Sequence, residues 1–232
     1  MIISSATIRH PVTDRRTKRQ QRDDITSKVL KVSFELFLTN GYRDTTIRQI
    51  SEGANAKAGS IYNVFHDKED IVKELVVYFY DIIVSKGQDL MHDMGDLMSS
   101  VAFPIAVELS MAHSNRNLAE IMSIAFSSSK VMDRLVGIQE EKTREYYSRF
   151  GIQMDSSRTR DVLYAINGVL EGFIIKSMSS DEKDIANELH ICMQVYCSLM
   201  GIPLLGIEDM ARSILATLED GSVLADVLDT FE

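Results

Sequence analysis

The chain has 232 residues, enough for one or two domains with a substantial core. Hydrophobic residues make up 45% and charged residues 25%, which is the composition of an ordinary globular protein and excludes a disordered or fibrous one. No apolar run approaches the roughly 18 residues that a membrane-spanning helix needs, and the polar residues 1–22 do not form a secretory signal. With three prolines and almost no alternating strand pattern, we expect an all-α cytoplasmic protein.

The net charge of −9 is unevenly distributed along the chain. Residues 1–80 carry 13 Lys and Arg against 10 Asp and Glu, whereas residues 81–232 carry 12 against 24. A basic N-terminal part followed by an acidic remainder of the chain is typical of a DNA-binding protein with a separate second domain. Six of the basic residues fall in residues 1–22, which predicts a mobile basic arm that either contacts DNA or stays free in solvent.

Two helices joined by a tight turn are predicted after this arm. Apolar residues at helical spacing predict a preceding helix that ends at Asn40-Gly41. Thr46 and Gln49 then have the spacing of a capping box, in which each side chain satisfies a free N–H group at a helix start. Small and polar residues at 53–57 suit a turn, and a second helix beginning near Lys57 carries the apolar residues of its inner face.

This arrangement is that of a helix-turn-helix reader of the DNA major groove. The side chains predicted to contact phosphates are those of Thr46, Arg48, Lys57, Tyr62, His66 and Lys68. Ser60 and Asn63 are predicted to read bases, and the small Ala58 and Gly59 allow the close approach of the helix to DNA. The alternative is a helical hairpin with a solvated polar face.

Residues 23–75 resemble the DNA-binding domain of the tetracycline-repressor (TetR) family of bacterial regulators. The features that match, at a spacing without gaps, are Phe37, Gly41-Tyr42, Thr45–Arg48, Ile50, Gly59–Tyr62, Phe65 and Lys68-Glu69. Lys57 and Ala58 replace the family's usual small hydroxyl residue and its frequent lysine, so the second helix lacks a usual N-cap. Asn63 and Val64 replace common aromatic or His residues, so the bases read do not follow from the resemblance.

The resemblance implies a homodimer in which each subunit carries an N-terminal DNA-binding domain and a larger helical domain for a small molecule. The usual role is that of a repressor released from a palindromic operator by its ligand. We therefore expect a basic arm at residues 1–22, a helix-turn-helix domain at 23–68, and an effector-binding and dimerisation domain at 69–232.

The body is predicted to consist of helices throughout. Asp67 caps a long helix that connects the two domains and extends, with a break, to about Ser99. Pro104 fits the start of the next helix. Further helices are predicted at 118–126, 131–150, 155–178, 181–200 and 207–218, with a final turn or two at 222–231.

The helices at 155–178 and 181–200 predict an antiparallel hairpin, because only a short connection separates them. Small residues on the first permit close approach of another helix, and the resemblance implies that this pair forms a four-helix bundle across the dimer axis. The predicted interface residues are Ala165, Gly168, Val169, Gly172, Phe173, Val195 and Leu199. The alternative is that the glycines serve packing inside one subunit.

Twelve methionines are many for this length, and methionine suits adaptable pockets. The predicted effector-lining residues are Met91, Met94, Phe103, Met111, Met122, Phe126, Met132, Tyr146, Tyr147 and Met178. Each is also explained by core packing. Glu171 would orient a ligand, pair across the dimer or face solvent. Because the body has few basic residues, an apolar or cationic effector is favoured over a polyanion.

No metal site or cofactor is predicted. Cys192 and Cys197 lie on different faces of a helix and are expected to be reduced, and His190 and Cys192 point to nearly opposite faces. A second possible function is a DNA-binding regulator whose body recruits a protein instead of a small molecule. An enzyme is disfavoured, because the sequence contains no phosphate-binding glycine loop, HExxH or CxxC motif.

Overall fold

The computed structural model describes residues 18–90, 97–149, 151, 153, 155–180, 182–219 and 221–228. Over these ranges the chain forms eleven helices and no strand, which confirms the all-α prediction. The helices are α1 (Lys18–Asn40), α2 (Ile47–Gly53), α3 (Ala58–Tyr62), α4 (Lys68–Leu90), α5 (Leu97–Ser114), α6 (Arg116–Ser127), α7 (Ser129–Arg149), α8 (Ser156–Ser179), α9 (Ile185–Met200), α10 (Ile207–Leu218) and α11 (Ser222–Leu228).

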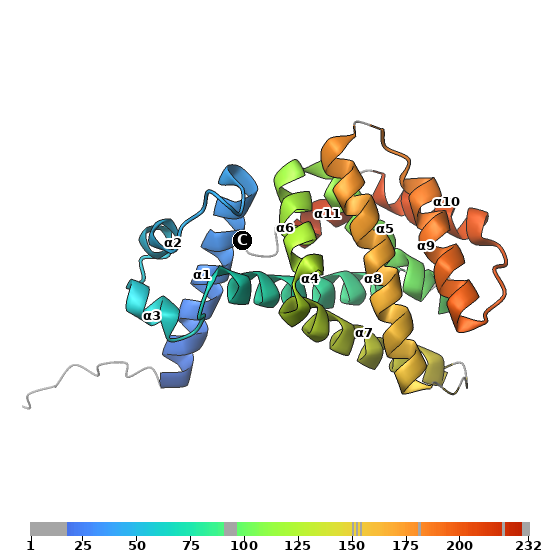
Figure 1. The fold of residues 1–232 in the computed structure, drawn as a ribbon, viewed down its shortest axis with the longest axis horizontal. Helices are drawn as coiled ribbons and strands as arrows, with labels where there is room; N and C mark the ends of the chain where they lie inside the picture. The colour runs from blue at the N-terminus through green and yellow to red at the C-terminus, as the bar shows by residue number, and fades with distance from the viewer. Residues whose placement is uncertain are drawn as a thin grey trace, which may run out of the picture.

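The helices form a small N-terminal group and a larger body (Figure 1). Helices α1, α2 and α3 lie at one end, and α4 runs from them into the body. The long helix α8 crosses the body, and α9 and α10 lie at the end away from the N-terminal group. No helix within the described ranges has the length and apolar character needed to cross a bilayer.

Several helices start after a short polar side chain that caps free N–H groups. The Thr46 N–H donates to Gln49 Oε1 at 2.7 Å, and the Gln49 N–H donates to Thr46 Oγ1 at 3.2 Å, which confirms the predicted capping box. Asp67 Oδ1 accepts from the Asp70 N–H at 2.8 Å at the start of α4. In the same way, Asn115 Oδ1 accepts from two N–H groups at the start of α6.

Three predicted helix boundaries differ from the structure. Helix α1 begins at Lys18, inside the segment expected to be an arm, while residues 1–17 lie outside the described residues. Pro104 lies inside α5 and does not begin it, because the helix already starts at Leu97. A proline removes a single helical hydrogen bond, and the neighbouring side chains of α5 are almost all buried, so packing offsets that loss. Helix α9 begins at Ile185 after its cap Asp184.

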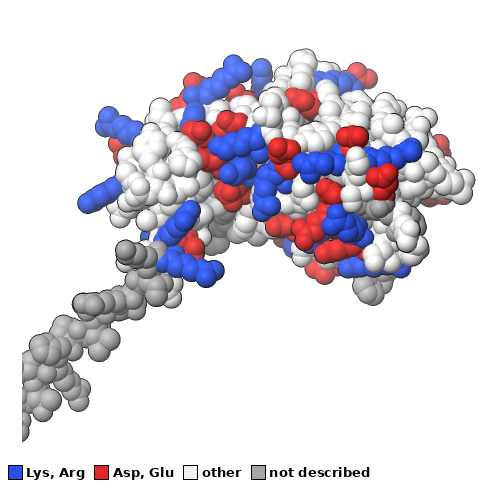
Figure 2. All heavy atoms as spheres, turned by 60° about the horizontal axis from the view of Figure 1, so that its bottom comes forward, with Lys and Arg blue, Asp and Glu red and all other residues white. Residues whose placement is uncertain are grey.

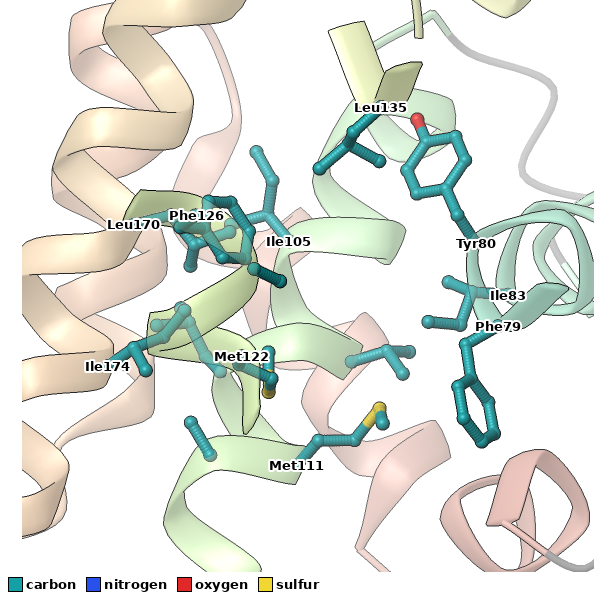
Figure 3. Close-up of a cluster of buried hydrophobic side chains, with 14 of the residues drawn as sticks. Phe79, Tyr80, Ile83, Ile105, Met111, Met122, Phe126, Leu135, Leu170 and Ile174 are labelled. Carbon is teal, nitrogen blue, oxygen red and sulfur yellow. The ribbon is translucent and has the colours of Figure 1, made fainter. Parts of the chain in front are cut away.

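A continuous apolar core joins α4 to the body. Figure 3 shows side chains of α4 facing those of α5 and α6, with α8 closing the other side. The labelled residues are Phe79, Tyr80, Ile83, Ile105, Met111, Met122, Phe126, Leu135, Leu170 and Ile174. Helix α4 belongs both to the N-terminal group and to this core. The packing of the core therefore helps to hold the N-terminal helices in position.

A buried charged group links three helices of the body. Glu188 on α9 is fully buried, and its two oxygens lie 2.8 Å from His113 Nε2 on α5 and 3.1 Å from Lys176 Nζ on α8. A buried carboxylate with two such partners is satisfied, and removing a partner would leave it uncompensated. The prediction of an antiparallel hairpin is also confirmed, because Arg158 near the start of α8 donates to the Leu199 carbonyl near the end of α9 at 2.7 Å.

Candidate DNA-binding surface and cavities of the body

The turn between α2 and α3 is held by local contacts. Asn55 has a positive φ of 47°, a conformation that Asn adopts more readily than most residues. The Ser51 hydroxyl donates to the Ala56 carbonyl at 2.5 Å across the turn. Ile61 and Phe65 are buried, as predicted, and they fix α3 against the helices beneath it. Because these buried side chains fix the orientation of α3, they also determine which residues α3 exposes on its outer face.

The outer face carries most of the residues predicted to bind DNA. Lys57, Ala58, Gly59, Asn63 and His66 are exposed, Tyr62 is 51% exposed, and Ser60 is half-buried. Lys57 occupies the N-cap position of α3 without making a side-chain cap, and its side chain is exposed to solvent. Thr46 and Arg48 are exposed on α2, and Arg48 pairs with Glu52 at 2.9 Å. In Figure 2, Lys and Arg project from the end that holds the N-terminal helices.

Lys68 differs from the other predicted DNA contacts. Its ammonium donates to the carbonyls of Tyr42 and Thr45, both at 2.7 Å, and lies 4.3 Å from the centre of the Tyr42 ring. Burial lowers the pKa of this ammonium. Two of its three donors therefore hold the connection between α1 and α2 in place, so a phosphate contact would have to use the third.

We expect Lys57→Met and Lys68→Met to have different effects. Lys57→Met should weaken DNA binding and reduce the slope of log affinity against log salt by about 1, with unchanged stability. Lys68→Met should lower the free energy of unfolding by about 1–3 kcal/mol, because it leaves two carbonyls without their charged donor. Thermal unfolding and salt-dependent binding to duplex DNA measure the two effects. Equal stability of the two variants would contradict the role given to Lys68.

Helix α6 connects the body to the N-terminal helices through polar contacts. Asn117 Nδ2 donates to the Leu38 carbonyl near the end of α1 at 2.7 Å. Glu120 Oε2 accepts from the Tyr42 N–H at 3.3 Å, and its other oxygen lies 3.4 Å from Arg43 Nε. These three contacts attach α6 to the segment between α1 and α2.

A second contact joins the start of α4 to α7. Lys130 Nζ lies 2.5 Å from Asp70 Oδ1, and together with the His66 N–H it holds the pKa of the buried Asp70 carboxyl well below its ordinary value. The Ser128 hydroxyl also donates to Glu69. The N-terminal helices are thus attached to the body at α4, α6 and α7.

Two small cavities lie between buried helices in the described part of the body. The apolar cavity, of about 50 Å³, is lined by Phe34, Leu75, Val76, Phe79, Tyr80, Ile83, Glu108, Met111, Leu118, Ile121, Met122, Ala125, Phe126 and Leu135. The polar cavity, of about 40 Å³, is lined by Tyr80, Ser100, Val101, Pro104, Ile105, Glu108, Gln139, Lys142, Thr143, Tyr146, Leu163, Ile166, Asn167, Leu170 and Tyr196. Tyr80 and Glu108 line both.

Glu108 is the most perturbed carboxyl group of the body. It is 8% exposed, and burial raises its pKa from 4.5 to about 8. Burial and the nearby Glu108 also raise the pKa of Tyr80. Glu108 was not among the predicted site residues, although the sequence carries a signal for it: Glu108 is the one charged residue in the apolar run from Val101 to Met111.

Some of the predicted effector-lining residues line these cavities. Met111, Met122 and Phe126 line the apolar cavity, and Tyr146 lines the polar one. The residues that line neither are Phe103, Met132, Tyr147, Glu171 and Met178. Tyr147 is instead fully packed, with its hydroxyl 2.8 Å from that of Tyr196. Met91 and Met94 lie outside the described residues.

The residues predicted at the dimer interface share a partly open face of α8 and α9. Ala165, Gly168, Gly172 and Leu199 are exposed, and Val169, Phe173 and Val195 are half-buried. A Cβ atom added at Gly168 or Gly172 would meet nothing within 4 Å. The alternative that these glycines serve close packing inside one subunit is therefore wrong for the part of the chain that the structure describes.

The cysteines are free and buried, as expected for reduced thiols. Burial raises the pKa of Cys192 to about 12, which keeps its thiol protonated and unreactive. Among the described residues, no three His, Cys, Asp or Glu side chains gather in a way that would hold a metal ion.

The N-terminal group and the separate body have the architecture of a helix-turn-helix domain followed by a larger helical domain. Residues 29–75 match the model of the bacterial regulatory proteins, tetR family. The repressor KstR2 of Mycobacterium tuberculosis is 35% identical over 63 residues, which are 27% of this chain and 32% of KstR2. The regulator HbdR of Aromatoleum sp. (strain CIB) is 30% identical over 145 residues, which are 61% of this chain and 59% of HbdR.

Solved structures share the fold of both parts. RolR, solved with its ligand resorcinol, has a TM-score of 0.64 at 16% identity and covers 84% of this chain and 96% of its own. A TetR-family transcriptional regulator from Syntrophomonas wolfei has a TM-score of 0.54 at 23% identity, covering 80% and 100%. Residues 29–75 are thus similar to the DNA-binding part of the tetR family, and the chain spans less than two thirds of the length of KstR2 or HbdR.

Proposed function

We propose that the protein is a homodimeric transcriptional repressor that a small molecule releases from a palindromic operator. The observation that carries this proposal is the exposed outer face of α3, which keeps Ser60, Tyr62 and Asn63 accessible while Ile61 is buried beneath them. Short hydroxyl and amide side chains on the exposed face of such a helix pair with base edges in the major groove. The exposed Lys57 adds a phosphate contact.

A dimer is supported by the face of α8 and α9 that carries the predicted interface residues. Tyr164 and Ile175 on α8 are 38% and 48% exposed, and Leu199 on α9 is 37% exposed. Gly168 and Gly172 lie between them and leave room for a second helix to approach. Large apolar side chains around small residues are typical of helix packing between subunits. Two recognition helices held by this face would meet successive major grooves, about 34–36 Å apart.

Release by a ligand follows from the position of α6. Ile121, Met122 and Phe126 on its inner face line the apolar cavity, while Asn117 and Glu120 on the same helix hold the segment after α1. A ligand that enlarges the cavity would shift α6 and thereby the N-terminal helices. The loss of operator affinity equals the difference in ligand affinity between the two arrangements, typically about 1–3 kcal/mol.

Selection of binding sequences from a random duplex DNA pool tests the DNA-binding part. We expect enrichment of a near-palindromic site, because a two-fold dimer reads two equal half-sites. Ser60→Ala and Asn63→Ala should each reduce affinity for that site by about 1–3 kcal/mol, with little effect on random DNA. Lys183→Ala, an exposed change on the far part of the body, is the matched control.

Phosphate contacts are strongest at low salt. If no sequence is enriched under that condition, the proposal that the protein binds a specific operator is contradicted. Enrichment followed by no response to any small molecule would favour the second function, in which the body recruits a protein. The second outcome leaves the DNA-binding part of the proposal intact.

A further inference from the structure

Glu108 and Tyr80 are buried polar residues of the body without hydrogen-bond partners among the described residues. Glu108 is 8% exposed and Tyr80 is 9% exposed. Within the described part of the chain, no hydrogen bond or ion pair involves the Glu108 carboxyl group or the Tyr80 hydroxyl. A buried carboxyl group without a partner costs free energy. Nothing in the fold requires it there, because an apolar residue would pack against the same neighbours.

Both groups lie between the two cavities, and each lines both of them. On one side the wall is apolar, and Figure 3 shows Met111, Met122 and Phe126 facing Tyr80 and its neighbours on α4. A ligand entering from this side would place its hydrocarbon part against that wall, and its polar part would meet Glu108 and Tyr80.

The polar cavity has other polar side chains, but its buried amides are already paired. Gln139 Nε2 donates to Asn167 Oδ1 at 3.2 Å, and Asn167 Nδ2 donates to Gln139 Oε1 at 2.7 Å. Glu108, Tyr80, Thr143 and Tyr146 are the buried cavity-lining groups among the described residues that keep unused hydrogen-bonding capacity, and of these four Glu108 and Tyr80 line both cavities. The pair can accept and donate, which matches a hydroxyl group, itself a donor and an acceptor.

We propose that Glu108 and Tyr80 form the hydrogen-bonding end of the effector site, and that the effector is a small, uncharged, mainly apolar molecule with a hydroxyl group. This inference rests on the proposed function, in which the body binds a small molecule. The effector is no larger than one ring, because both cavities are smaller than the roughly 150 Å³ that holds benzene, and even one ring must displace lining side chains to enter.

The charge of the site supports an uncharged effector. Lys142 is the one Lys or Arg that lines either cavity among the described residues, and it lies 3.9 Å from Glu145. A buried anion would therefore lack a free counter-charge. Glu108 has a pKa of about 8, so its carboxyl group is mostly protonated at neutral pH and offers a hydrogen bond instead of a negative charge to a cation.

Phenol and toluene are the probes for this site, since they have nearly the same size and differ by a hydroxyl against a methyl group. Calorimetry or chemical-shift titration of the full chain gives both dissociation constants, Kd. From wild type to Glu108→Leu, the ratio of the toluene Kd to the phenol Kd should fall at least about tenfold. Glu108→Leu should fold, because it replaces an unpaired buried carboxyl group by an apolar side chain. Glu171→Leu, which lines neither cavity, should keep the wild-type ratio.

An unchanged ratio in Glu108→Leu overturns the inference, as does the absence of binding by either probe at millimolar concentration. Operator affinity measured with and without phenol separates this inference from the proposed function. Binding that depends on Glu108 but leaves operator affinity unchanged supports the site and removes control by this class of ligand. If the protein does not bind the operator even without a probe, the proposed DNA contacts of α3 are wrong. The result on ligand binding in the cavities is then unaffected.

Discussion

Glu108→Gln should make the protein more stable than wild type at neutral and higher pH. In the folded chain the Glu108 carboxyl group has a pKa of about 8, against an ordinary value of 4.5. Its ionised form is therefore disfavoured by folding, whereas an amide of the same shape does not ionise. The free energy of unfolding of the variant, relative to wild type, should rise by roughly 3 kcal/mol between about pH 5 and about pH 8.

The sign follows from proton binding. Above pH 4.5 the unfolded carboxyl group loses its proton while the folded one keeps it, so the folded state binds more protons and wild type loses stability as pH rises. The loss levels off above about pH 8, where both states are ionised. The titratable and charged groups that line the cavities or act on Glu108 are Tyr80, Lys142, Tyr146, Cys192 and Tyr196.

Urea unfolding at a series of pH values measures this difference, and other titrating groups cancel between variant and wild type. Glu182→Gln is the control, because Glu182 is exposed and should show no pH-dependent difference. A constant difference between Glu108→Gln and wild type across the range would contradict the buried, unpaired state of the carboxyl group. A ligand that satisfies Glu108 should reduce the gain from the variant, since it stabilises wild type alone.

The DNA-binding part was predictable because its determinants are local. Thr46 and Gln49 are three residues apart and cap α2 by themselves, and the inner residues Ile61 and Phe65 have helical spacing. The exception is Lys68, which looked like a phosphate contact but donates to carbonyls of Tyr42 and Thr45. Those partners lie 26 and 23 residues earlier, so nothing in the neighbouring sequence reveals them.

The cavities were harder to predict because they form where five helices meet. Methionines along the chain indicated adaptable packing, and Met111 and Met122 do line the apolar cavity. Phe103 and Tyr147 have the same character in sequence but pack elsewhere, because periodicity gives the inner face of a helix and not its neighbour. Glu108 was visible as a charge in an apolar helix, yet its lack of a partner depends on α4, α7 and α9.

Gly172→Glu should abolish the dimer without unfolding the subunit. A Cβ atom at Gly172 meets nothing within 4 Å, and the position is exposed on α8, so the single chain has room for the longer side chain. Replacing glycine inside a helix by a better helix former should even stabilise the isolated subunit, by up to about 1 kcal/mol. In a close helix interface, by contrast, the same side chain would clash and bury a charge.

Operator affinity should fall at least about 100-fold in Gly172→Glu, because a monomer binds one half-site instead of two. Light scattering gives the oligomeric state, and binding to the selected duplex gives the affinity. Ala216→Glu is the control, since Ala216 is also an exposed small residue inside a helix and lies on α10, outside the proposed interface. A dimeric Gly172→Glu protein with wild-type affinity would place the subunit interface on another face. The exposed Tyr164 and Ile175 would then need a different partner.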